Sequence, residues 1–178
     1  MHEQLVSLDP FTESDYDTLI SWVDNAEMLM QFAGPAFTYP LTRAQLERSQ
    51  SDANRYAFKV ALFGQELMIG YAKVYLGENI AYLGRLLIAD PENRNKGLGA
   101  SLVYELLDLT FIELGQKRVA LNVFDWNKAA IRCYEKAGFV INPNLKVERF
   151  IDGQSWTALN MTIDQADWMA KHDLAFEF

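Results

Sequence analysis

A strand-like run that leads through a glycine-containing turn into a long apolar helix is the feature that most restricts this fold. The run 79–89, NIAYLGRLLIA, is rich in strand-forming residues, and 98–115, LGASLVYELLDLTFIELG, has two apolar stripes at helical spacing. The stripes consist of Leu102, Leu106 and Leu109 and of Val103, Leu107, Phe111 and Leu114. A helix with this much apolar surface packs against a sheet. The turn 91–97, PENRNKG, therefore joins a strand to a helix that covers the sheet.

Patterns elsewhere predict the order two helices, three strands, helix, strand, helix and two strands. The helical patterns cover 11–25, 41–52, 98–115, 127–138 and part of 164–178. The strand patterns cover 56–63, 67–76, 79–89, 117–124 and, as two strands around a turn at Asp152, 139–163. The segment 32–40 is predicted to be a loop because it contains one glycine and two prolines. This order predicts a mixed α/β sheet in a single domain, 1–178.

The composition excludes several classes of protein. Half of the residues are hydrophobic, and the net charge of -8 argues against binding to nucleic acid, which requires a basic face. The longest apolar stretch is interrupted by Glu105, Asp108 and Glu113, so we expect no membrane span. One cysteine, Cys133, and two histidines provide little material for a metal site. With no signal-like apolar core at the start, these features predict a cytoplasmic protein without a metal.

The turn ahead of the long helix has the properties of an anion site. Gly97 and Gly99 allow a ligand to approach the backbone closely, and the first N–H groups of a helix lack internal partners. Arg94 and Lys96 add positive charge. A plain strand-to-helix turn with two solvated cations would give the same sequence. A P-loop is excluded because no Lys-Ser or Lys-Thr follows the glycines, and a dinucleotide fingerprint because Leu102 replaces its third glycine.

Two motifs resemble the GNAT family of N-acetyltransferases. RNKGLG, 94–99, is similar to the family's R/Q-x-x-G-x-G/A signature, and NKAAIRCYEKAGF, 127–139, is similar to its second motif, N-x-x-A-x-x-x-Y-x-x-x-G-F. The element order is similar from near residue 5 to about residue 163, with most resemblance to the branch of ribosomal-protein and polyamine acetyltransferases. The resemblance implies a mostly antiparallel, strongly twisted sheet flanked by helices, with a splayed pair of central parallel strands.

The resemblance also implies that the anion is the pyrophosphate of acetyl-coenzyme A, used as a co-substrate. Backbone N–H groups of the loop would cradle the pyrophosphate, and the strand before the loop would pair with the pantetheine arm. The coenzyme-binding residues implied are Leu87, Ile88, Ala89, Arg94, Asn95, Lys96, Gly97, Leu98, Gly99, Ala100 and Asn127. A strand pair that splays to admit the ligand leaves backbone groups unpaired without it.

Tyr134 is the catalytic residue that the resemblance implies. A phenol with an ordinary pKa near 10 stays protonated at neutral pH and can donate its proton to the departing thiolate. The ring could instead only pack, because Ala130, Tyr134 and Ala137 share one helical face. Asn127 could cap its helix, contact the coenzyme, or do both. The oxyanion donor is implied to be a backbone N–H at a strand bulge near Ala89.

The general base is not evident from the sequence. Many family members carry a Glu where this chain has Gly84, and no acid occurs within 79–89. Glu78, Glu27 and Asp24 are candidates for a base from elsewhere. A chain of water molecules that takes the proton to solvent is the other alternative.

Four residues are candidates for binding the acceptor. Phe32, Phe37 and Tyr39 fall where the family has its substrate loop, and they could line a pocket or merely anchor the loop. Arg85 could bind a carboxylate of the substrate or reach solvent. We expect an N-acetyltransferase that acts on a primary amine of a small molecule or peptide by direct attack in a ternary complex.

Two other classes of protein stay open at this point. One is a catalytically degenerate sensor that binds acyl-coenzyme A, which Gly84 favours, and the other is a structural protein that keeps the fold without the ligand. The sequence identifies neither the acceptor nor the oligomeric state. The apolar ending LAFEF, 174–178, could pack on the same chain or on a second copy in a homodimer.

Overall fold

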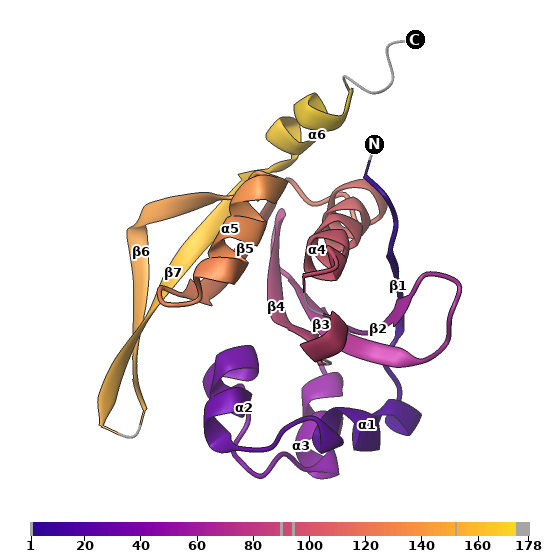
Figure 1. Cartoon of the computed structure of the whole chain (residues 1–178). Helices are drawn as coiled ribbons and strands as arrows, with labels where there is room; N and C mark the ends of the chain where they lie inside the picture. Colours follow the sequence, from indigo (N-terminus) through magenta and orange to yellow (C-terminus); the bar gives the residue numbers. More distant parts are fainter. Residues whose placement is uncertain (1, 90, 94, 152, 174–178) are drawn as a thin grey trace.

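A single mixed sheet organises the chain in the computed structural model, which describes residues 2–89, 91–93, 95–151 and 153–173 (Figure 1). The strand order is β1-β2-β3-β4-β5-β7-β6. The strands are β1 Val6–Pro10, β2 Arg55–Leu62, β3 Met68–Leu76, β4 Ile80–Ile88, β5 Arg118–Phe124, β6 Val140–Ile151 and β7 Gln154–Asp164. Neighbouring strands are antiparallel except for the parallel pair β4 and β5. The mixed, mostly antiparallel architecture that the sequence predicts is therefore confirmed.

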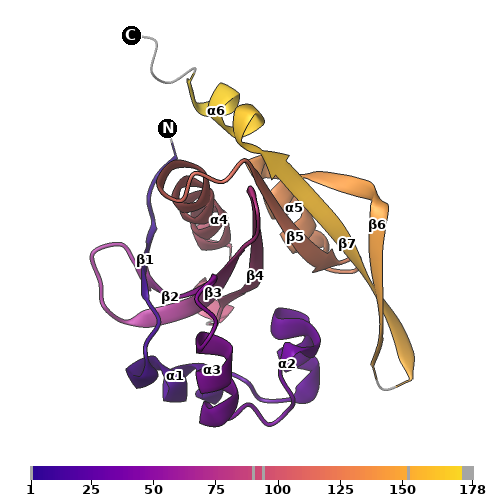
Figure 2. The ribbon, with the colours of Figure 1, turned by 180° about the vertical axis from the view of Figure 1, so that it is seen from behind.

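Helices lie on both sides of this sheet (Figures 1 and 2). The helices are α1 Tyr16–Ser21, α2 Ala26–Ala33, α3 Arg43–Gln50, α4 Leu98–Asp108, α5 Lys128–Ala137 and α6 Gln165–Asp173. A π-helical segment, Leu109–Glu113, continues α4, and single turns of 3-10 helix cover Glu13–Asp15, Gly34–Ala36 and Pro91–Asn93. In Figure 1, α4 and α5 lie in front of the strands, and α1, α2 and α3 gather below them. No helix in these ranges is long and apolar enough to cross a membrane.

Two apolar cores hold the helices to the sheet. Most of the two apolar stripes is buried, with Leu109 and Leu114 only half-buried, and Leu106 and Leu107 of α4 pack in the larger core with Val119 of β5. A second core joins α1, α2 and α3 to Tyr71 of β3, whose neighbour Ala72 belongs to the larger core. Successive side chains of a strand point to opposite faces of the sheet. One strand therefore contributes to both cores.

The parallel pair separates along its length. Pairing between β4 and β5 runs only from Ile80 opposite Arg118 to Leu83 opposite Leu121, although β4 continues to Ile88. Beyond Leu121, β5 stays paired with β7 as far as Phe124. The divergence of β4 from β5 is visible in Figure 2, with α2 below it. The expected splayed pair is confirmed.

A β-bulge in β4 lies inside the separated region. Tyr71 of β3 is opposite Leu87, but Lys73 is opposite Gly84, so that Arg85 and Leu86 together face the single residue between them. Arg85 has a φ of 56°, a left-handed conformation that is uncommon for a residue with a side chain. Gly70 permits the close approach of β3 here, because an added Cβ would run into the carbonyl oxygen of Leu87.

Two elements correct the predicted order. β1 was not predicted, and the segment that was expected to be loop from residue 32 onward contains the end of α2, so Phe32 is helical. The signal for α2 was present, because Asn25 caps the helix by accepting a hydrogen bond from Met28 N at 2.7 Å. The prediction was wrong because Gly34 and Pro35, which end the helix, dominated the local pattern.

Helix boundaries marked by capping residues agree with the sequence. Thr42 accepts a hydrogen bond from Gln45 N at the start of α3, and Asn127 accepts one from Ala130 N at the start of α5. Gly138 ends α5 with a φ of 111°. These sites were predictable because a helix end leaves N–H and C=O groups that a few residue types satisfy.

Candidate functional site

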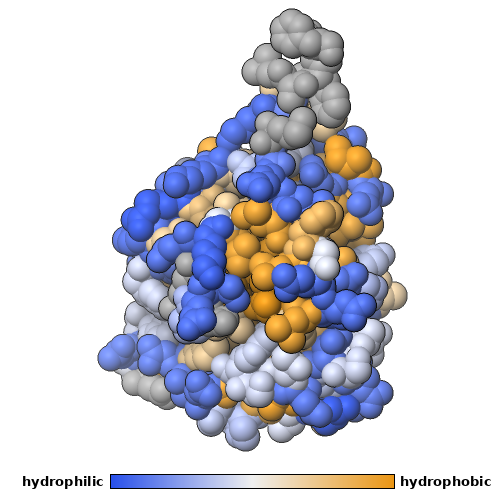
Figure 3. Space-filling view, turned by 45° about the vertical axis from the view of Figure 1, so that its right-hand side comes forward, coloured by the Kyte–Doolittle hydropathy of each residue, from blue (hydrophilic) through white to orange (hydrophobic). Residues whose placement is uncertain are grey.

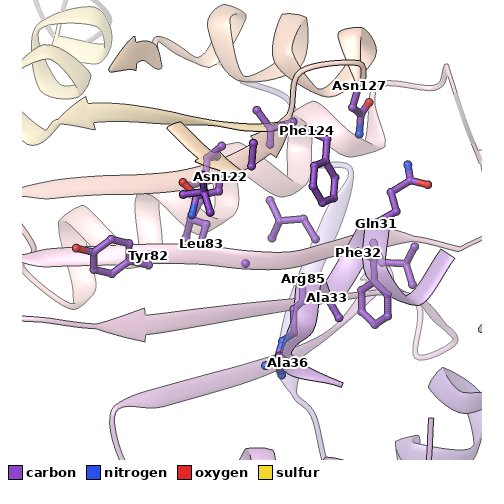
Figure 4. Close-up of a pocket in the computed structure, with 18 of the residues that line it drawn as sticks. Gln31, Phe32, Ala33, Ala36, Tyr82, Leu83, Arg85, Asn122, Phe124 and Asn127 are labelled. Carbon is purple, nitrogen blue, oxygen red and sulfur yellow. The ribbon is translucent and has the colours of Figure 1, made fainter. Parts of the chain in front are cut away.

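A cavity of about 460 Å³ opens where β4 and β5 separate (Figure 4). Figure 4 shows Asn122 and Phe124 projecting from β5 on one side, and Gln31 and Phe32 approaching from α2 on another. The residues that line it are Met28, Gln31, Phe32, Ala33, Gly34, Pro35, Ala36, Tyr75, Tyr82, Leu83, Gly84, Arg85, Leu86, Leu87, Leu121, Asn122, Val123, Phe124, Asn127, Tyr134, Val147, Arg149 and Ala158. The separated strands therefore border a real cavity in the described chain.

The N-terminus of α4 lies at the end of the loop that follows β4. Gly97 precedes the helix with a φ of 77°, and Asn95 also has a positive φ of 60°. Ser101 N donates to Gly97 O, so the helical ladder begins there and the N–H groups of Leu98, Gly99 and Ala100 precede it. A Cβ at Gly99 would meet no protein atom within 4 Å. The N–H groups of the first turn of α4 thus have no main-chain partner among the described residues, and the space beside Gly99 is open.

Two cationic residues were expected beside this loop. Lys96 is exposed in the structure, whereas Arg94 lies outside the described residues. Charge on Lys96 and the dipole of α4 both favour an anion at the same place.

The main chain at the end of β4 is used differently on its two sides. Ala89 N donates to Ile69 O of β3 at 2.9 Å, so this N–H is not available to an oxyanion. The bulge lies at Arg85 and Leu86 rather than near Ala89. Because neighbouring residues of a strand direct their main-chain groups to opposite sides, the N–H of Ile88 points to the separated side. The expected donor at Ala89 is therefore corrected.

Tyr134 lies half-buried on α5 and contributes to the cavity wall. Its ring packs edge-on against Phe139 with centroids 5.9 Å apart, so the packing role is real. Its hydroxyl has no hydrogen-bond partner within the described part of the chain, and burial raises the pKa of the phenol well above 10. The phenol is therefore protonated at neutral pH, and no described residue accepts its proton.

Asn127 connects α5 to the same cavity. Its side-chain oxygen caps the helix through Ala130 N at 3.2 Å, and the residue also lines the cavity. The amide nitrogen of the side chain makes no hydrogen bond to a described residue. One side chain can therefore cap the helix and contact a ligand.

None of the proposed general bases lies in the cavity wall. Glu78, Glu27 and Asp24 are exposed, and no Asp or Glu lines the cavity among the residues that the structure describes. Gly84 is in the wall, and a Cβ there would lie 3.1 Å from the ring of Tyr75. A larger residue at position 84 would have to displace that ring.

The four candidates for acceptor binding separate into two groups. Phe32 lines the cavity of Figure 4, and Arg85 lines both this cavity and a second one that Phe37 also borders. Tyr39 lines neither cavity and donates through its hydroxyl to Asp24 O at 3.0 Å. Of the two roles considered for Tyr39, the structure supports anchoring of the loop.

Sequence reasoning missed several residues of the cavity wall. Met28 and Gln31 come from the unpredicted helix α2, and Asn122 and Arg149 come from β5 and β6. The alternation along β5 could have identified Asn122, which is exposed between the buried Leu121 and Val123. Arg149 had no local signal, because its place depends on how the β6–β7 hairpin packs.

The chain belongs to the GNAT acetyltransferases. The model of the acetyltransferase (GNAT) domain matches residues 6–140, which is more than half of the chain. This match covers the splayed strands, the loop ahead of α4, and all of α5 with Tyr134.

Curated relatives extend the comparison. A spermidine N(1)-acetyltransferase of Escherichia coli K12 is 35% identical over 86 residues, covering 48% of this chain and 46% of the relative. The match thus spans about half the length of that relative. An aminoglycoside N(6')-acetyltransferase type 1 of Klebsiella pneumoniae is 28% identical over 151 residues, covering 75% of this chain and 73% of the relative.

Solved structures show the same fold. A spermidine N-acetyltransferase from Vibrio cholerae in complex with coenzyme A and spermine superposes with a TM-score of 0.78 at 24% identity, covering 94% of this chain and 99% of that chain. Another structure of the Vibrio enzyme is described as dodecameric, with a TM-score of 0.76, 21% identity, and coverage of 95% and 99%. At this identity the likeness carries the fold alone.

Proposed function

We propose that this protein transfers an acetyl group from acetyl-coenzyme A to a primary amine by direct attack in a ternary complex. The observation that carries the proposal is the separation of β4 from β5 directly beside the free N–H groups of α4. An extended thiol arm fits the separated strands, and a pyrophosphate fits the start of the helix. Membership of the GNAT acetyltransferases supports the same assignment.

The coenzyme-binding residues keep the roles expected of them. The N–H groups from Asn95 to Ala100 cradle the pyrophosphate, and the segment from Leu87 to Ala89 pairs with the pantetheine arm through the main-chain carbonyl of Ile88, which faces the separated side. Asn127 offers the amide nitrogen of its side chain. Bound in this way, acetyl-coenzyme A supplies the activated acetyl group as a co-substrate.

Tyr134 acts as the general acid of the reaction. The amine nitrogen attacks the thioester carbon, the N–C bond forms, and the carbonyl oxygen becomes an oxyanion that the N–H of Ile88 stabilises. As the C–S bond breaks, the phenol of Tyr134 gives its proton to the departing sulfur. With no described carboxylate in the wall, the amine releases its proton to solvent water.

Thermal unfolding with and without acetyl-coenzyme A tests the binding step. Ligand at about 100 to 1,000 times its dissociation constant should add roughly 2.7–4.1 kcal/mol to the free energy of unfolding. Release of free thiol across a panel of amines tests the chemistry. No thermal shift would exclude both the transferase and an acyl-coenzyme A sensor, leaving a structural protein. A shift without thiol release would favour the sensor.

Location and assembly remain predictions. We expect a cytoplasmic protein that forms a homodimer.

A further inference from the structure

A second cavity adjoins the first one and shares Arg85 with it. It has a volume of about 620 Å³ and is bordered by the loop after α2, by α3 and by the start of β2. The side chains that matter here are those of Phe37, Arg48, Ser49, Arg55 and Arg85. In Figure 4 the side chain of Arg85 extends from β4 toward Ala36, which lines both cavities. Arg85 therefore stands between the space beside Tyr134 and the second cavity.

The charge of the two cavities is opposite to the charge of the chain. The whole sequence has 24 acidic and 16 basic residues. Nevertheless, within the described ranges no Asp or Glu side chain lines either cavity, whereas Arg85, Arg149, Arg48 and Arg55 do. Arginines gather at these walls although acids predominate in the chain. The walls are therefore suited to a ligand that carries negative charge.

Arg85 is buried without a carboxylate. Arg85 is only 8% exposed. Its Nη1 donates to Ser49 Oγ at 2.8 Å, and its guanidinium lies 4.2 Å from the ring centroid of Phe37. Arg85 forms no ion pair with any described residue. A buried charge is normally paired, because removing it from water is costly. The partners of its guanidinium are the uncharged Ser49 and Tyr71, so its charge is available to an anion from outside the chain.

A second buried cation shares the same serine. Lys73 is fully buried, and its Nζ donates to the carbonyl oxygen of Ser49 at 2.7 Å and also to Ser49 Oγ. It too has no ion pair with a described carboxylate. Burial, and then the charges of Arg85 and Arg55, lower the pKa of Lys73 to about 7. The only described acid that acts on this group is Asp52, which is already paired with Arg55 at 2.9 Å.

We infer that the acceptor amine carries a carboxylate, which Arg85 binds with Arg48 and Arg55 while the amine reaches into the cavity beside Tyr134. The inference rests on the proposed acetyl transfer. A guanidinium binds a carboxylate through two parallel hydrogen bonds, which fixes the orientation of the acceptor as well as its charge. A polyamine, by contrast, would bring further positive charge to a wall of arginines, and like charges at an interface are unfavourable. The acceptor is therefore an amino acid or another amino carboxylate.

Matched pairs of amines test this inference on the unmodified protein. Each pair combines an unbranched ω-amino acid with the alkylamine of the same length or with the corresponding diamine, over a series of increasing lengths. Isothermal titration of each into protein loaded with coenzyme A measures binding without requiring turnover. At the preferred length we expect the amino acid to bind about tenfold or more tightly than the alkylamine, and the diamine to bind most weakly. Equal binding of amino acid and alkylamine, or a preference for the diamine, would overturn the inference.

Substitution of Arg85 tests its assigned role. Arg85→Gln should remove the preference for the amino acid by raising its KM about tenfold or more relative to the KM of the alkylamine, measured on the same variant. Arg43→Gln is the matched control, because Arg43 lies on α3 like Arg48 but pairs outside the cavity with Asp17 at 2.7 Å. A preference retained in Arg85→Gln would contradict the role.

Further measurements distinguish a failure of folding, or of acetyl transfer, from a failure of the carboxylate inference. If Arg85→Gln fails to fold, the double substitution of the exposed Arg48 and Arg55 by Gln should still weaken binding of the amino acid, and unchanged binding would count against the inference. Thiol release that occurs equally with both members of every pair would leave the acetyl transfer standing and refute the carboxylate. Tight binding of the amino acid without thiol release would support the anion site and refute the transfer.

Discussion

Tyr134 combines a packed ring with the hydroxyl that we propose as the proton donor. Its ring packs against Phe139, and the residue lines the cavity. Tyr134→Phe keeps the ring and removes the proton donor. We expect turnover to fall by about 100-fold, a typical contribution of general acid catalysis, with coenzyme affinity within about twofold of the wild type.

The pH profile gives a further check on Tyr134. Because burial raises the pKa of the phenol, the donor stays protonated, and the rate should rise with pH as the amine loses its proton, without a fall below about pH 10. Tyr56→Phe, at an exposed tyrosine that lines neither cavity, should be without effect. Wild-type turnover in Tyr134→Phe would leave the residue with packing alone.

Lys73 should make the free energy of unfolding increase with pH between about pH 7 and about pH 10. Its pKa is lowered from 10.5 to about 7, so between these values the unfolded chain binds a proton that the folded chain does not. The free energy of unfolding therefore decreases as the pH falls through this range. Lys73→Met removes the titrating group. As the pH falls from about 10 to about 7, the free energy of unfolding of the variant should therefore increase relative to that of the wild type. Urea unfolding at several pH values measures this difference, and the exposed Lys146→Met serves as the control. Parallel pH curves for wild type and Lys73→Met would contradict the lowered pKa.

At the scale of elements, the junction of β4 and α4 depends on two glycines with different requirements. Gly97 has a φ of 77°, so a valine there is strained whether or not a ligand binds. Gly99 is in the first turn of α4 with open space beside it. Gly99→Val is therefore the cleaner test of the pyrophosphate cradle.

We expect Gly99→Val to weaken binding of acetyl-coenzyme A by about tenfold or more, because the branched side chain occupies the space that the phosphates need. The melting temperature without ligand should stay close to that of the wild type. Gly97→Val should lower both the affinity and the stability, the latter by about 1–2 kcal/mol. Calorimetric titration and thermal unfolding measure the two quantities, and normal affinity in Gly99→Val would refute the cradle.

At the scale of the whole molecule, exposed apolar side chains are gathered on one edge strand of the sheet. β6 pairs only with β7 and carries the exposed Val140, Ile141, Leu145 and Phe150. Figure 3, in which the right-hand side of Figure 1 is turned forward, shows an apolar area near the centre of the view, bordered by hydrophilic residues. An edge strand with exposed apolar residues can pair with another chain.

We therefore expect the homodimer to form through β6. Light scattering should give twice the mass of one chain, 20.3 kDa, and Phe150→Asp should return the mass to that of the monomer. Phe63 is 60% exposed at the other end of the sheet, so Phe63→Asp is the matched control. A single-chain mass for the wild-type protein would exclude the homodimer.

Local sequence patterns predicted much of the fold. The two stripes of α4 defined a helix buried against a sheet, and Asn127 and Gly138 marked both ends of α5. These features could be predicted because capping and helical periodicity involve residues only a few positions apart. β1 could not be predicted, because its five residues become a strand only through pairing with β2, about fifty residues away.

The chemistry of the acceptor side arose from packing between distant segments. Arg85 belongs to β4, but its burial depends on Ser49 of α3 and Phe37 of the preceding loop. The arginines that line the two cavities come from α3, β2, β4 and β6. Near neighbours along the chain were thus enough to define α3, α4, α5 and the loop ahead of α4, and the family resemblance then implied Tyr134. The environment of Arg85, and with it the charge of the expected acceptor, came from contacts between residues that no local pattern relates.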